Sequence, residues 1–209
     1  MIFTKDDYWA LHSLFHALYA GYKPNVLEAP NGDGKVDVQK RYLHVALKYN
    51  PPEWAVKYLA RAHFEACRIA EALQVPPEFY PRVQDGTLRV LDYPAGVGSA
   101  PHTDFDLFTV HCYRSTPEDF VRLSAVDPRA EAIDPHVHLG ELAELIGVGK
   151  ATEHFVAEQT YEQRSIVYFA MPDHSAMLPP YSPIGGVDGI GLSVGEWLAE
   201  RYKRSRVYK

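Results

Sequence analysis

Residues 88–110 read LRVLDYPAGVGSAPHTDFDLFTV, and this stretch decides the fold. Two runs rich in apolar and β-branched residues, 88–93 and 107–113, flank a segment of Gly, Ser and Pro. Between them lies a His-Thr-Asp triplet at 102–104. Because residues i and i+2 of a strand point to the same face, the triplet can aim an imidazole and a carboxylate at one point. The stretch therefore predicts two strands beside a candidate metal site.

Downstream, the pattern of short β-rich runs continues. Further strands are predicted at 120–123, 154–157 and 165–170, with Gly, Pro, Asp and Ser clustered between them. One short helix is predicted at 139–146. Many short strands separated by turn signals indicate a sandwich or small barrel, a group that includes the jelly roll.

Upstream, the sequence is mainly helical. Thr4 and Asp7 resemble an acidic capping box, and apolar residues at helical spacing follow them. A longer amphipathic helix is predicted over 51–73, where a Pro-Pro pair suits the first turn. Residues 23–34 are rich in Pro, Gly, Asn and Asp and predict a loop, while 35–50 show no clear period.

Composition sets the broad class. The chain has 209 residues, 46% hydrophobic and 23% charged, with a net charge of −6. No long run of like charges occurs, so we expect no nucleic acid or anionic membrane as partner. There is no signal-peptide core or 18-residue apolar stretch, and the two cysteines fit a reducing compartment. We expect a cytoplasmic monomer.

We expect one domain over residues 1–209, given its length. It should comprise a helical N-terminal layer over 1–80, a β core over 85–180 and a C-terminal helix over 190–206.

The His-x-Asp triplet alone is weak, because a chain with 10 histidines should contain roughly 0.6 such triplets by chance. Its surroundings add specificity. Residues 88–110 resemble the isopenicillin N synthase-like branch of the 2-oxoglutarate and Fe(II)-dependent dioxygenases: a strand ending in Tyr-Pro, a Gly-rich loop, His-Thr-Asp and a hydrophobic strand. The resemblance spans about residues 55–206. It includes LGELAELIGVGKATEHFV (139–156), RSIVYFAMPDHSAMLPP (164–180) and SVGEWLAERYKR (193–204).

The resemblance implies a mainly β fold with flanking helices, the double-stranded β-helix or jelly-roll oxygenase core. It also implies that His102, Asp104 and His154 hold one Fe(II), with three positions open for substrate, co-substrate and O2. No catalytic residue is implied beyond this metal centre. The family's N-terminal region is usually longer, so residues 23–34 and 35–50 are candidates for a lid.

The activity implied is oxidation of a small organic molecule by Fe(II), O2 and 2-oxoglutarate. Hydroxylation, desaturation and cyclisation are the expected outcomes, with natural-product metabolism as one setting. Two alternatives stay open: an oxidase of isopenicillin N synthase type that does not use 2-oxoglutarate, and a non-catalytic binding protein on the same fold.

The co-substrate site matches the family less well. The family holds the far carboxylate of 2-oxoglutarate with an Arg-x-Ser pair and a Tyr, which here predicts Arg164, Ser165 and Tyr93. However, Gln163 stands at the family arginine position, and in a regular strand Arg164 points to the other face. Either a β-bulge brings Arg164 back, or another cation such as Arg89 substitutes, or 2-oxoglutarate is not used.

Four further residues are possible contributors to the site. His111 and Asp106 are candidates for lining the substrate pocket, since they follow the triplet along the chain and lie on or next to the strand that leaves it. His136 and His138 share i, i+2 spacing but lack a third ligand, so we expect ordinary strand residues.

Overall fold

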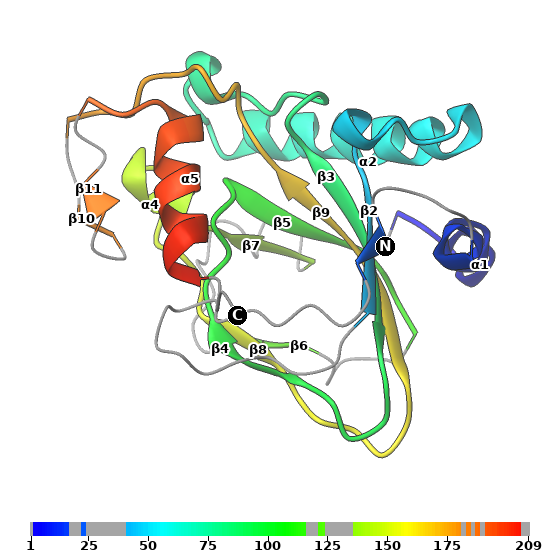
Figure 1. The fold of residues 1–209 in the computed structure, drawn as a ribbon. Helices are drawn as coiled ribbons and strands as arrows, with labels where there is room; N and C mark the ends of the chain where they lie inside the picture. The colour runs from blue at the N-terminus through cyan, green and yellow to red at the C-terminus, as the bar shows by residue number, and fades with distance from the viewer. Residues whose placement is uncertain are drawn as a thin grey trace.

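The computed structural model describes residues 2–16, 22–23, 41–115, 121–123, 136–180, 183–184, 187–188 and 191–205. Two antiparallel sheets face each other at its centre (Figure 1). The larger has the order β1-β2-β3-β9-β5-β7, and the smaller β4-β8-β6. The strands are β1 (Tyr22–Lys23), β2 (Arg41–Val45), β3 (Thr87–Tyr93), β4 (Ser99–His102), β5 (Phe108–Arg114), β6 (Val121–Leu123), β7 (Val137–Leu139), β8 (His154–Val156) and β9 (Gln163–Ala170).

Helices lie outside the sheets. Helix α2 runs along the outer face of the larger sheet, and α5 stands near the open end of the two sheets (Figure 1). A small hairpin, β10 (Pro183–Ile184) and β11 (Val187–Asp188), precedes α5. The helical segments are α1 (Lys5–His12), η1 (Ser13–His16), η2 (Leu47–Tyr49), α2 (Glu53–Ala72), η3 (Pro77–Phe79), α4 (Glu141–Leu145) and α5 (Val194–Ser205). Among the described residues, no helix is both long and apolar enough to cross a membrane.

This architecture confirms the predicted double-stranded β-helix. The Thr4 capping box is present at α1, and the long predicted helix is α2. The helix predicted over 139–146 is shorter, because Leu139 completes strand β7. Strands β4 and β7 were not predicted, and β2 falls in the unassigned segment. Of the lid candidates, residues 24–40 lie outside the described residues.

The two faces of the larger sheet differ in what they pack against. On β3, Leu88 and Val90 belong to the main core with the apolar side of α2. Leu91 and Tyr93 belong to a second cluster with Val156 of the facing sheet. This alternation is the period of a strand. Residues of β3 and β9 that share the parity of Leu91 therefore point into the barrel.

Candidate metal centre

Two strands of the smaller sheet bring the predicted ligands together. His102 ends β4 and is the register partner of His154 at the start of β8. Asp104 lies just beyond β4, so the turn rather than strand parity aims its carboxylate. One ligand atom from each residue lies within 4.8 Å of the others. The Nε2 atoms of His102 and His154 are 3.8 and 3.7 Å from the nearer oxygens of Asp104.

Backbone carbonyls orient both imidazoles. Nδ1 of His102 lies 2.7 Å from the carbonyl oxygen of Ala100, and Nδ1 of His154 lies 3.1 Å from that of Thr152. A carbonyl can only accept, so each Nδ1 carries the hydrogen and each Nε2 presents a lone pair. This is how proteins commonly fix a metal-binding histidine.

Hydrogen bonds to one oxygen hold the carboxylate of Asp104 in place. Its Oδ2 accepts hydrogen bonds from Thr109 Oγ1 at 2.6 Å and His138 Nε2 at 2.9 Å. Burial acts to raise the pKa of Asp104, but His154 and His138 outweigh it and hold the pKa well below its usual range. Asp104 is therefore an ionised ligand with Oδ1 left for a metal.

His138, expected to be an ordinary strand residue, lies on β7 and also contacts the carboxylate of Asp104. Burial, with His154 beside it, lowers its pKa to about 4, so the ring is neutral. Its Nε2 faces Asp104 and its Nδ1 lies 3.2 Å from His111 Nε2. A buried series of polar contacts thus runs from His111 through His138 to Asp104. Pairing of β7 with β5 creates it, with His138 opposite Thr109.

The donor set fits a mononuclear iron site. Two imidazoles and one carboxylate on one side of a cation, with the remaining positions open, are the facial arrangement typical of non-haem Fe(II) oxygenases. The three ligands are pre-oriented by their own hydrogen bonds. This arrangement can bind a divalent metal and leave room for two further molecules.

His138→Ala should weaken Fe(II) binding by about 10–100-fold, because loss of a partner behind a metal ligand has that typical effect. Competition with a chelator under anaerobic conditions measures it. His63→Ala is the matched control, since His63 contacts Tyr168 and Cys67 on the helix side of the sheet. Unchanged affinity in His138→Ala would remove His138 from the metal centre.

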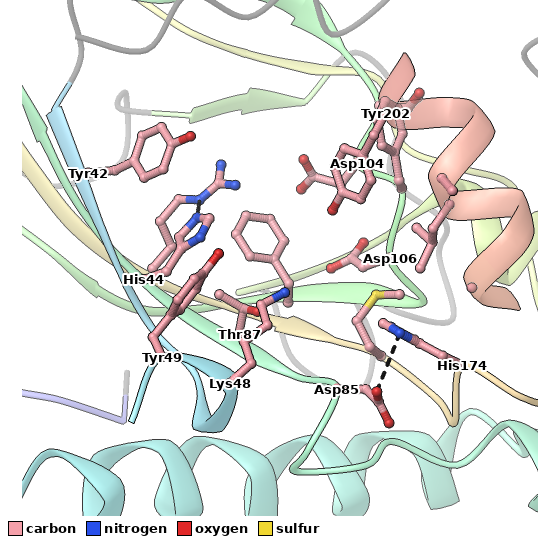
Figure 2. A pocket seen from close by; sticks show the side chains of 18 of the residues that line it. Tyr42, His44, Lys48, Tyr49, Asp85, Thr87, Asp104, Asp106, His174 and Tyr202 are labelled. Carbon is pink, nitrogen blue, oxygen red and sulfur yellow. Dashed lines mark hydrogen bonds and ion pairs between the residues drawn. The ribbon is translucent and has the colours of Figure 1, made fainter. Parts of the chain in front are cut away.

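A cavity of about 380 Å³ opens beside the ligands. Asp104 and Asp106 lie on one side of it, and Tyr42, His44 and Tyr49 lie opposite (Figure 2). Burial and the charge of Asp104 raise the pKa of Asp106 well above its usual range. The Thr109 hydroxyl lies 2.9 Å from Oδ2 of Asp106 and 2.6 Å from Oδ2 of Asp104, so it lies between the two carboxyl groups.

The two residues predicted to line the substrate pocket, Asp106 and His111, therefore differ in position. Asp106 lies in the wall of this cavity. His111 lies behind His138 and is not among the lining residues described for the cavity.

Arg164 lies on the outer face of β9 and does not face the interior, contrary to its predicted place at the co-substrate site. It is the register partner of Asp92, with no register shift between β3 and β9. Its guanidinium lies 4.9 Å from the ring centre of Trp9 and pairs with Glu162. The bulge considered for β9 is thus absent along its pairing with β3.

A bulge occurs instead in β5. Its register with β9 shifts between His111 and Tyr113, so that Arg114 pairs with Ser165. In a regular strand Arg114 would share the outer face of Val110; the extra residue turns it inward. Nε of Arg114 and Oγ of Ser165 are buried without a hydrogen-bond partner in the described part of the chain. No signal in the sequence pointed to Arg114.

The interior also holds the other predicted co-substrate residues and Arg89. Tyr93 pairs with Gln163 and Leu91 with Ser165, so Tyr93 and Ser165 both face inward. The Gln163 amide donates to the Ala157 carbonyl at 2.8 Å. Arg89 shares this parity and lines the cavity beside the metal ligands.

Known proteins were compared at the level of sequence and of fold. No model of a protein family matches the sequence, and no curated protein does. The fold matches a full-length Neurospora crassa protein solved in complex with alpha-KG and thymine, with a TM-score of 0.58 and 14% identity over 97% of this chain and 85% of that one. It also matches a dioxygenase for auxin oxidation from rice, with a TM-score of 0.53 and 17% identity over 96% and 76%.

This chain has the fold of the 2-oxoglutarate and Fe(II)-dependent oxygenases. Against the same Neurospora crassa protein bound to alpha-KG alone, the match covers 78% of this chain but only 65% of that one, at a TM-score of 0.54. The pairing of β4 with β8 brings His102 and His154 together. The isopenicillin N synthase-like branch stays a prediction.

Proposed function

We propose that this oxygenase-fold chain is a 2-oxoglutarate-dependent Fe(II) oxygenase that oxidises a small organic molecule. The observation that carries the proposal is the convergence of ligand atoms from His102, Asp104 and His154, with His102 and Asp104 in the wall of a cavity. When bound, iron and 2-oxoglutarate supply the oxidising chemistry: substrate C–H, O2 and 2-oxoglutarate give substrate C–OH, succinate and CO2. Hydroxylation is the default outcome.

The protein's own groups would bind and orient. His102 and His154 would present Nε2 to the metal, and Asp104 would present Oδ1 while Thr109 and His138 hold Oδ2. Packed apolar residues between the sheets would exclude water from the reacting centre.

Arg114, Ser165 and Tyr93 are the residues we propose for the far carboxylate of 2-oxoglutarate. Nε of Arg114 and Oγ of Ser165 are buried donors that have no acceptor in the described structure. The carboxylate of 2-oxoglutarate would supply the acceptor oxygens. Arg114 would replace the cation that the family places at position 163. Burial lowers the pKa of Arg114, as expected for a cation removed from water.

Arg114→Gln should weaken 2-oxoglutarate binding by about 30–100-fold, because one charge-assisted bidentate contact is lost. Anaerobic titration of the Fe(II) protein with 2-oxoglutarate measures this. Arg164→Gln is the matched control: it removes the same charge from the outer face and should leave the affinity within about twofold. A larger loss of 2-oxoglutarate affinity in Arg164→Gln than in Arg114→Gln would instead assign the co-substrate carboxylate to Arg164.

The activity itself is tested by succinate release. The protein should convert 2-oxoglutarate to succinate in the presence of Fe(II) and O2, and a chelator should stop the reaction. Mass spectrometry of the products decides it. No succinate from iron-loaded protein that also fails to bind 2-oxoglutarate would contradict the proposal.

One observation favours the alternative of an oxidase that does not use 2-oxoglutarate. Gln163, whose amide donates a hydrogen bond to the Ala157 carbonyl, occupies the position where the family has its arginine. That enzyme would bind iron tightly and show no binding of 2-oxoglutarate, so the same titration separates the two functions.

A further inference from the structure

We infer that the cavity beside the metal site binds a small organic acid, with Arg89 holding the carboxylate of the substrate. This inference rests on the proposed function and names its substrate class. Two arginines on strands of the larger sheet, Arg114 and Arg89, face inward in the described part of the chain. Arg114 lies beside Ser165, whereas Arg89 lies opposite Val167 and lines the cavity with His102 and Asp104.

Arg89 is held in one orientation. Its Nε donates to His44 Nε2 at 2.8 Å. Its guanidinium lies between two rings, 4.6 Å from the centre of Tyr42 and 4.5 Å from that of Phe169. A stacked guanidinium loses little further freedom when it binds, and its terminal nitrogens form the fork that matches a carboxylate.

The charges around the cavity are arranged asymmetrically. His44 lies across the cavity from Asp104 (Figure 2), Arg89 donates a hydrogen bond to His44, and Lys48 also lines the cavity. Three acidic residues of the described chain line the cavity. Asp104 belongs to the candidate metal centre, Asp106 lies on the same side as Asp104, and Asp85 lies 3.5 Å from the His174 ring (Figure 2). An anionic group entering the cavity would therefore be drawn to the Arg89 wall, leaving the rest of the molecule toward the metal.

The remaining lining favours a compact apolar body. Aromatic rings contribute much of it, from Tyr42, Tyr49, Phe105, Phe169 and Tyr202. A volume of about 380 Å³ is near the lower end of ligand sites, which span roughly 300–1,000 Å³. One guanidinium among rings suits a monocarboxylate better than a phosphate, which carries more charge and more acceptor oxygens.

Calorimetry with matched pairs of probes tests this inference. The probes are phenylacetate, 3-phenylpropanoate and cyclohexanecarboxylate, each beside its neutral amide, added to anaerobic Fe(II) protein with and without saturating 2-oxoglutarate. At least one acid should bind about tenfold or more tightly than its amide. Arg89→Gln should abolish that preference while changing 2-oxoglutarate affinity by less than about threefold.

Two further variants keep the test sharp. Arg89→Lys keeps the charge without the fork and should retain part of the preference, which guards against a folding defect in Arg89→Gln. Arg164→Gln, on the outer face, should retain all of it. Melting curves followed by circular dichroism check that each variant is folded.

Three results would overturn the inference: no acid preferred over its amide by the unaltered protein, a preference that survives Arg89→Gln, or a tenfold loss of 2-oxoglutarate affinity in Arg89→Gln. The last would make Arg89 the co-substrate cation. Failure of the proposed function is distinguishable, because the unaltered protein would then bind no iron or 2-oxoglutarate, whatever its preference for acids.

Discussion

His154→Ala should lower the affinity for Fe(II) by more than about 100-fold, a larger effect than loss of a supporting partner such as His138. Only His102 and Asp104 would remain, and two ligands do not form a facial site. Because His154 lies on β8, a different strand from the one that leads into the His102–Asp104 turn, its loss should leave the backbone of that turn intact.

Anaerobic equilibrium dialysis followed by metal analysis measures this loss. His63→Ala serves again as the control, because it removes an imidazole from the helix side of the sheet. Retention of full iron affinity in both His154→Ala and His102→Ala would exclude the three-residue metal site.

Arg201→Ala should destabilise the protein by about 3–5 kcal/mol, the usual result of leaving a buried charge without its partner. Arg201 on α5 and Glu141 on α4 are each 5% exposed and form two hydrogen bonds of 2.8 and 2.6 Å. Glu141 also accepts from Thr103 at 2.6 Å, and its backbone N–H donates to the Asp104 carbonyl. The C-terminal helix is thereby tied to the turn that carries the metal ligand.

Urea unfolding gives the free energy of unfolding for each variant. Lys203→Ala is the matched control on the same helix, since its partner Glu200 is exposed and such pairs contribute less than about 1 kcal/mol. Glu141→Gln combined with Arg201→Met should cost less than Arg201→Ala alone. A loss no greater than that of Lys203→Ala would show that the buried pair does not stabilise the fold.

The three candidate metal ligands could be proposed from the sequence because the His-x-Asp signal is local and the family resemblance adds His154. His102 and Asp104 stand two residues apart between two recognisable strand runs, and His154 begins another. The geometric reason was only partly right, since Asp104 lies in the turn after β4. The strand runs and turn residues predicted a sandwich or small barrel, and the family resemblance narrowed this to the double-stranded β-helix.

The co-substrate residues could not be predicted in the same way. One extra residue near Cys112 reverses the face of Arg114, and nothing in a run of alternating side chains reveals such a bulge. The regular pairing of β9 likewise leaves Arg164 outside. Strand parity is sensitive to a shift of one residue, so a local irregularity decides which arginine enters the barrel.

The role of His138 depends on tertiary pairing. Its spacing from His136 suggested at most a second metal site, whereas its actual partner is Asp104, 34 residues earlier in the chain. Only the pairing of β7 with β5 brings these two groups together. A polar contact of this kind has no local pattern in the sequence.

Anaerobic titration of metal-free protein with Fe(II) and then 2-oxoglutarate tests the central claim most directly. We expect one equivalent of iron to bind and the addition of 2-oxoglutarate to produce the weak visible charge-transfer band of its iron chelate. The band should be absent in His154→Ala. Tight iron binding with no band at any concentration of 2-oxoglutarate would contradict a 2-oxoglutarate-dependent oxygenase.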